Sequence, residues 1–220
     1  MASSNIMKDR DLKAVIFDLD GVLCSTDKYH FAAWKMIADE LGLPFDEQKN
    51  NRLRGVSRMD SLEIILGDRS SEFTDEEKKA LADRKNAAYR KLLKNLSGSD
   101  IAEGAEEVIG HLRAEGKLIA VGSSSKNTKM ILEQLGLLHS FDAISDGTNI
   151  MRSKPDPEVF LKAAEYLGIE PPACLVVEDA RSGIEAAGRA GMRSAAIGDA
   201  AGCGIADHDL ESLTDLKEII

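Results

Sequence analysis

The chain has 220 residues, of which 28 are basic and 38 acidic, so its formal net charge is −10 with histidine neutral. A nucleic-acid-binding protein needs a surplus of lysine and arginine on at least one face, so this balance argues against that class. Hydrophobic residues make up 43% of the chain and charged residues 30%, which is typical of a soluble globular protein. The length suits one domain that carries a smaller insert.

The sequence shows no sign of a membrane or secreted protein. Its apolar runs, such as residues 14–17, are far shorter than the ~20 residues that a membrane-spanning helix needs. Residues 1–12 are polar and lack the apolar stretch of a secretion signal. The three cysteines, Cys24, Cys174 and Cys203, are widely spaced without metal-ligand spacing, which suits a reducing compartment. We therefore expect a cytoplasmic protein with no membrane partner.

Short apolar runs alternate with segments of helical periodicity along most of the chain. Strands are predicted at 14–17, 118–121, 143–144, 175–177 and 195–197. Helices are predicted between the later strands, at about 105–115, 127–135, 157–167 and 182–190, with Asn127 and Asp156 as N-caps of the second and third. This alternation predicts an α/β fold whose parallel sheet is covered by helices on both faces.

Residues 27–93 interrupt this alternation, because they contain no convincing strand. Three helices are predicted there: one through Phe31, Trp34, Ile37 and Leu41, one at about 62–66, and one that begins at a capping box over 74–77. Their aromatic and leucine side chains are interpreted as packing residues. We predict an all-helical insert, the cap, at 27–93, and a core formed by 1–26 and 94–220.

Polar residues follow the predicted strands at the point where each strand ends. Ligands bind at the carboxyl ends of the strands in an open parallel sheet, and the groups found there are Asp18, Asp20, the serines 123–125, Lys154, Glu178 and Asp179. Several carboxylates in one place repel each other unless a cation lies among them. Oxygen-only ligands suit a hard ion, and Mg²⁺ that holds a phosphate is the common case. Taken alone, an acidic pair after a strand is more typical of a turn.

The segment Asp18-Leu19-Asp20-Gly21 is the most specific local signal. Two carboxylates spaced two residues apart can point to the same side, where one attacks and the other moves a proton. A carboxylate is a competent nucleophile toward a phosphoryl group when the charges are screened. Gly21 would let the chain turn sharply away.

These segments resemble the four motifs of the haloacid dehalogenase superfamily, in order and over nearly the whole chain. The superfamily implies an aspartyl-phosphate intermediate on a Rossmann-like core with Mg²⁺ as cofactor. The insert resembles the β-phosphoglucomutase branch of that superfamily. The residues that carry this second resemblance are Tyr29, His30, Trp34, 53–58, 60–62, 84–86 and 125–127.

The resemblance implies a role for each matching residue. Asp18 would be the phosphorylated nucleophile and Asp20 the general acid/base, while Mg²⁺ would be bound by the Asp18 carboxylate, the Asp20 carbonyl, Glu178 and Asp179. The transferred phosphoryl group would be held by Ser123, the Ser124 backbone and Lys154. The other phosphate would be held by Arg58, Ser125, Lys126 and Asn127, and the sugar would be lined by His30, Gly55, Val56, Ser57, Ser61 and Lys85. Thr26, at the start of the insert, matches the family's hinge position, and Arg54 stands where the family usually has lysine.

The resemblance predicts a monomeric β-phosphoglucomutase that interconverts β-D-glucose 1-phosphate and glucose 6-phosphate. A mutase needs a second anion clamp to turn a bisphosphorylated sugar over, whereas a phosphatase needs only water. An Mg²⁺-dependent sugar-phosphate or phosphoglycolate phosphatase on the same core is the alternative, and a non-catalytic phosphate sensor is a third. Without the family, His30, Arg58 and Lys85 are typical of a solvated helix surface, and Cys24 is either a reactive thiol or a buried, inert one.

Overall fold

The computed structural model describes residues 11–53 and 56–220. Its centre is a six-stranded parallel sheet in the order β3-β2-β1-β4-β5-β6. The strands are β1 (Ala14–Phe17), β2 (Leu118–Gly122), β3 (Ala143–Ser145), β4 (Cys174–Glu178), β5 (Arg193–Ala196) and β6 (His208–Asp209). The first strand lies between two others, since Ala14 is in register with Leu118 of β2 and Cys174 of β4. The predicted α/β parallel sheet is confirmed.

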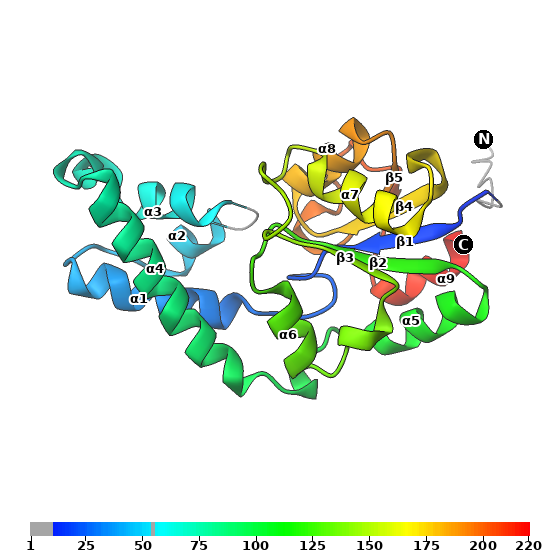
Figure 1. The fold of residues 1–220 in the computed structure, drawn as a ribbon, viewed down its shortest axis with the longest axis horizontal. Helices are drawn as coiled ribbons and strands as arrows, with labels where there is room; N and C mark the ends of the chain where they lie inside the picture. Colours follow the sequence, from blue (N-terminus) through cyan, green and yellow to red (C-terminus); the bar gives the residue numbers. More distant parts are fainter. Residues whose placement is uncertain (1–10, 54–55) are drawn as a thin grey trace.

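Alternate residues of the strands belong to two separate hydrophobic clusters, because successive side chains of a strand point to opposite faces of the sheet. Val15 and Phe17 pack with α5 (Ala105–Ala114), α6 (Thr128–Gln134) and α9 (Leu216–Ile219). Ala14 and Ile16 pack with α7 (Glu158–Leu167) and α8 (Arg181–Arg189). Figure 1 shows these two helix layers on either side of the sheet.

Four helices lie between β1 and α5, and this segment has a hydrophobic cluster of its own. They are α1 (Asp27–Glu40), α2 (Glu47–Asn51), α3 (Arg58–Leu66) and α4 (Asp75–Leu92), and no strand lies in the described residues of this segment. The cluster includes Trp34, Ile37 and Leu62, as expected from the helical spacing. The predicted capping box is present, since Thr74 and Glu77 bond each other's backbone amides at the start of α4. In Figure 1 these helices lie to one side of the sheet.

Several local features differ from the sequence prediction. The helix α7 begins at Glu158, one residue later than predicted, but Pro157 already has helical backbone angles, and Asp156 Oδ1 accepts the Glu158 amide at 3.0 Å, which is the bond expected of the predicted N-cap. Asn127 stands at the N-cap position of α6 without making the side-chain cap predicted for it. The elements β6, α2 and α9 were not predicted. Short 3-10 turns lie at Gly67–Glu72, Leu93–Asn95, Gly98–Asp100, Leu138–Ser140, Pro171–Ala173, Gly198–Ala200 and Leu213–Asp215. Within the described residues, none of the helices is long and apolar enough to cross a membrane.

Candidate active site

Three carboxylates and an ammonium meet at the carboxyl ends of β1 and β4. Asp18 follows β1, Glu178 ends β4, and Asp179 follows it. Lys154 comes from the segment between β3 and α7, and the peptide bond that follows it, Lys154-Pro155, is cis. Its Nζ forms an ion pair with Asp18 Oδ1 and lies 2.5 Å from Glu178 Oε1. The topology therefore brings together residues that are 136 positions apart in the chain.

Glu178 is the most tightly held of these groups, with 1% of its surface exposed. Its Oε2 accepts the Ala180 amide at 2.8 Å, while its Oε1 faces Lys154. Burial raises the pKa of Glu178 even though Lys154 opposes the shift. Burial would lower the pKa of Lys154, but the attraction of Asp18 and Glu178 outweighs it and raises that pKa. The lysine is therefore a fixed cation among carboxylates.

Asp179 completes the acidic group and shows how crowded the negative charge is. Burial, followed by the repulsion of Asp18, Glu178 and Asp20, raises the pKa of Asp179 to about 8, against the opposing effect of Lys154. Its Oδ2 lies where a side chain at Gly21 would begin, 1.9 Å from an ideal Cβ position. Gly21 also has a φ of +86°, so this turn requires glycine both for its conformation and for its space.

The acidic group has the chemistry of a magnesium site, because it offers only oxygen ligands and carries more negative charge than Lys154 compensates. No three histidine, cysteine, aspartate or glutamate side chains form a ready metal site among residues 11–53 and 56–220. In this arrangement the ammonium of Lys154 pairs with both Asp18 and Glu178.

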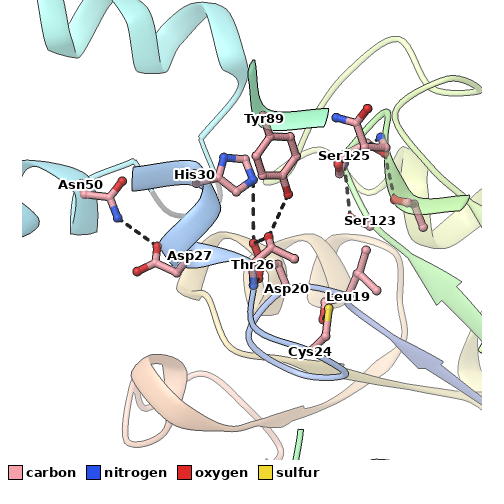
Figure 2. Close-up of polar contacts among 12 residues, drawn as sticks. Leu19, Asp20, Cys24, Thr26, Asp27, His30, Asn50, Tyr89, Ser123 and Ser125 are labelled. Atoms are coloured by element: carbon pink, nitrogen blue, oxygen red, sulfur yellow. Dashed lines mark hydrogen bonds and ion pairs between the residues drawn. The ribbon is translucent and has the colours of Figure 1, made fainter. Parts of the chain in front are cut away.

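Asp20 points to the junction with the helical segment, as Figure 2 shows. Its Oδ1 accepts the Thr26 amide at 2.7 Å, and its Oδ2 accepts the Thr26 hydroxyl at 2.6 Å. Tyr89 on α4 donates to the same Thr26 hydroxyl at 2.9 Å. Burial raises the pKa of Asp20 to about 6, although the bonds from Thr26 oppose the shift and Asp18 adds to it. A carboxyl group with a pKa close to neutrality can both accept and donate a proton.

A buried lysine and a histidine lie beside Asp20 on the helical side. Lys85 Nζ is 2.8 Å from His30 Nδ1, and His30 Nε2 is 3.9 Å from Asp20 Oδ2. Burial and, to a smaller extent, Arg58 lower the pKa of Lys85 to about 7, against the opposing effect of Asp20. Burial, Lys85 and Arg58 together hold the pKa of His30 well below its usual value. Lys85 is therefore buried and is not a solvated charge on a helix surface, whereas His30 is bonded to it and keeps 35% of its side chain exposed.

The serine loop after β2 forms a chain of short-range contacts. Ser123 Oγ accepts the Ser125 amide at 3.2 Å, and Ser125 Oγ accepts the Asn127 amide at 3.2 Å. The Asn127 side chain donates to Asn86 Oδ1 of α4 at 3.0 Å, which explains why it does not cap α6. Lys126 and the Ser124 carbonyl pack against Gly147, where a Cβ would lie 2.9 Å from Lys126 N and 2.4 Å from Ser124 O.

A cleft of about 610 Å³ separates the start of α3 from the segment that carries Lys154. Val56 and Ser57 line its helical wall, and Ser57 N-caps α3 by accepting the Asp60 amide at 3.2 Å. Arg58 and Ser61 follow in the first turn of that helix. The remaining two predicted sugar-binding residues, Arg54 and Gly55, lie outside the described residues. The described site residues thus come from the loops after β1, β2 and β4, the segment between β3 and α7, the segment that leads into α3, and helices α1, α3 and α4.

Four residues of this region were not predicted, namely Asp60, Asn86, Tyr89 and Arg152. Tyr89 is 1% exposed and lies eight residues after the buried Leu81, which is about two helical turns, so its sequence pattern is that of a core residue.

Cys24 is 1% exposed, and burial together with nearby Asp20 and Asp18 raises the pKa of its thiol. It is therefore the inert cysteine of the two alternatives, because the thiolate is the reactive form.

Comparison with known proteins agrees with this architecture. Residues 12–191 match the family model of the haloacid dehalogenase-like hydrolases. The chain is 43% identical to a β-phosphoglucomutase from Bacillus subtilis over 85% of this chain and 84% of that protein. It is 31% identical to a phosphorylated carbohydrates phosphatase from Thermotoga maritima over 82% of each chain. The crystal structure of a β-phosphoglucomutase from Clostridium difficile superposes with a TM-score of 0.87 at 36% identity, covering 93% of each chain. The chain is an enzyme that belongs to the haloacid dehalogenase-like hydrolase family.

Proposed function

We propose that this enzyme is a β-phosphoglucomutase that interconverts β-D-glucose 1-phosphate and glucose 6-phosphate through β-glucose 1,6-bisphosphate. The observation that carries the proposal is that the helical segment contributes its own polar set to the site. Lys85 and His30 lie next to Asp20, and Asn86 bonds to Asn127 in the serine loop. A mutase must bind a sugar that carries a phosphate at each end, which requires polar groups from the helical segment as well as from the strand ends of the sheet.

In the proposed reaction Asp18 carries the phosphoryl group and Asp20 moves the proton. The phosphorylated Asp18 gives its phosphoryl group to the 6-hydroxyl of the sugar while Asp20 takes the hydroxyl proton. The bisphosphate then turns over. Asp18 takes the 1-phosphoryl group, and Asp20 returns the proton to the leaving oxygen at carbon 1. The pKa of Asp20, raised by burial to about 6, suits both directions of proton transfer.

The other predicted residues keep the roles that the resemblance implies. Ser123, the Ser124 backbone and Lys154 hold the transferred phosphoryl group, and Thr26 is the hinge next to Asp20. The second phosphate contacts Arg58, Ser125, Lys126 and Asn127, and the sugar contacts His30, Gly55, Val56, Ser57, Ser61 and Lys85. Arg54 belongs to the same substrate-binding segment, where the family usually has lysine. Residues 27–93 act as the cap that closes over the sugar and excludes water.

Magnesium is the cofactor that these residues fit. It would be held by the Asp18, Glu178 and Asp179 carboxylates and the Asp20 carbonyl. Burial, and after it the repulsion of the neighbouring carboxylates, raises the pKa of Asp179 in this set. When bound, Mg²⁺ screens the negative charges of the nucleophile and the phosphate from each other. We further propose that the enzyme is a cytoplasmic monomer whose partner is a small sugar phosphate.

A sugar-phosphate or phosphoglycolate phosphatase is the second candidate. It is favoured by the 31% identity to the Thermotoga maritima phosphatase, which extends over 82% of both chains. The two candidates share Asp18, Asp20 and Mg²⁺, and they differ in what accepts the phosphoryl group. The acceptor is a sugar hydroxyl in the mutase and water in the phosphatase.

One assay separates the two candidates. The enzyme is incubated with β-D-glucose 1-phosphate, Mg²⁺ and a trace of glucose 1,6-bisphosphate, and glucose 6-phosphate and free phosphate are measured in parallel. The mutase predicts glucose 6-phosphate with little free phosphate. Stoichiometric release of free phosphate would establish the phosphatase instead. Asp18→Asn serves as the control and should abolish both products.

A further inference from the structure

The cleft between the two parts of the molecule has walls of opposite charge. On the side of α3 it is lined by Val56, Ser57 and Asp60, so this wall carries a carboxylate. On the opposite side it is lined by residues 151–155 and Ser182, which include the cations Arg152 and Lys154. The carboxylate of Asp60 repels a phosphate group that enters the cleft, and the two cations on the opposite side attract it.

Arg152 and Lys154, the two cations that line the cleft opposite α3, are not equivalent. Lys154 has a side chain that is 4% exposed, and its ammonium is already paired with Asp18 and Glu178. Arg152 has a side chain that is 72% exposed. Its Nε lies 3.1 Å from Asp156 Oδ2, and its two terminal nitrogens make no hydrogen bond to residues 11–53 and 56–220. With respect to these residues, the terminal nitrogens are therefore available to a bound anion.

The backbone that carries Arg152 is fixed to the core. The amides of Met151 and Arg152 donate to the same oxygen of Glu158 at 3.0 and 2.9 Å. Glu158 begins α7, which packs on the sheet through Val159 and Phe160. An arginine on an anchored backbone, with one edge oriented by a carboxylate, loses less freedom when its other edge binds a phosphate.

We infer that Arg152 binds a phosphate of the incoming sugar phosphate at the mouth of the cleft and so contributes to substrate affinity. This inference rests on the proposed function for the identity of the ligand. Arg152 supplies a positive charge at the mouth of the cleft, beside the carboxylates of Asp156 and Glu158, on a protein with a net charge of −10. Because Arg152 is far more exposed than the buried group around Asp18, it acts on binding and not on the phosphoryl transfer itself.

The test compares Arg152→Gln, Arg152→Lys and a matched control, Arg113→Gln. Arg113 lies on α5, is 47% exposed, and faces Asp142 at 3.8 Å, so its removal changes net charge equally away from the cleft. Binding of glucose 6-phosphate is measured by calorimetry at about 50 and about 300 mM KCl, because surface attraction is screened within ~10 Å at 0.1 M salt. The kcat and KM for β-D-glucose 1-phosphate are measured in parallel.

Arg152→Gln should raise the Kd for glucose 6-phosphate about three- to tenfold at low salt, with a smaller change at high salt. Arg152→Lys should retain part of the affinity, Arg113→Gln should match the wild type, and kcat should change less than about twofold. Equal Kd values for Arg152→Gln and Arg113→Gln at both salt concentrations would overturn the inference. If the wild type binds glucose 6-phosphate without forming it from β-D-glucose 1-phosphate, the proposed function fails while the Kd comparison still decides the role of Arg152. A wild type that does not bind glucose 6-phosphate overturns both.

Discussion

Gly183→Ala should displace the buried carboxylate that holds the candidate site together. An ideal Cβ at Gly183 would lie 1.9 Å from both Cδ and Oε1 of Glu178. Carbon atoms in ordinary contact are about 3.5–4.0 Å apart, so the carboxylate must move by about 1.5 Å. Glu178 is 1% exposed and bonds both Lys154 and the Ala180 amide, so this movement breaks at least one of these bonds.

The magnitude follows from two opposing contributions. Loss of one hydrogen bond to a charged group costs about 1.5–3 kcal/mol. Alanine in place of glycine within a helix returns about 1 kcal/mol, so Gly183→Ala should lower the free energy of unfolding by about 0.5–2 kcal/mol. Gly188→Ala, in the same helix α8, is the matched control because its Cβ would have nothing within 4 Å. That variant should raise the free energy of unfolding by about 0.5–1 kcal/mol.

Urea unfolding followed by circular dichroism measures the difference between the two variants, which should be about 1–3 kcal/mol. Turnover of Gly183→Ala should also fall, because Lys154 loses one of its two carboxylate partners. Turnover of Gly188→Ala should match the wild type. Equal stabilisation of both variants, with normal turnover, would refute the assigned packing of Glu178 against α8.

Three further changes test other parts of the structure. Lys85→Met removes a buried ammonium whose folded-state pKa, lowered by burial to about 7, lies below its unfolded value. Its gain in unfolding free energy should therefore be largest at pH 7 and below and should shrink by about 1.4 kcal/mol per pH unit toward pH 10, and a gain independent of pH would contradict the buried cation. Thr74→Ala removes the capping box of α4 and should cost about 0.5–2 kcal/mol in urea unfolding, whereas an unchanged midpoint would argue against the cap. Asp20→Ala should lower kcat by about 10²–10⁴-fold in protein that is still folded by circular dichroism, and near-normal kcat would exclude Asp20 as the acid/base.

The main features of the sheet could be predicted because its strands are short, buried on both faces and separated by clear helical periodicity. β1 has four buried residues in a row, which gives an unambiguous apolar run. β6 has only two residues, one of them exposed, so it has no such run. The helix α2 covers only five polar and charged residues, Glu47–Asn51, and depends on the cap at Asp46 and on packing for its stability.

The acidic edge could be predicted because parallel strands deliver their carboxyl ends to one place whatever their loops do. Contacts between the helical segment and the core could not, since they depend on how two packed units meet. Asn127 has the sequence of a helix cap, yet its amide binds Asn86, which is 41 positions away. Tyr89 has the spacing of a core residue, yet its hydroxyl bonds Thr26 beside Asp20. Sequence periodicity indicates that such a side chain is buried, but it does not identify the hydrogen-bond partner of the side chain's polar group.

The most direct test of the account is to locate the phosphoryl group on the enzyme. The protein is incubated with Mg²⁺ and glucose 1,6-bisphosphate, quenched in acid, digested and examined by mass spectrometry. The account predicts one phosphoryl group on the peptide that contains Asp18, carried by that residue and absent from Asp18→Asn. A phosphoryl group on any other residue, or its persistence in Asp18→Asn, would contradict the claim that Asp18 carries it.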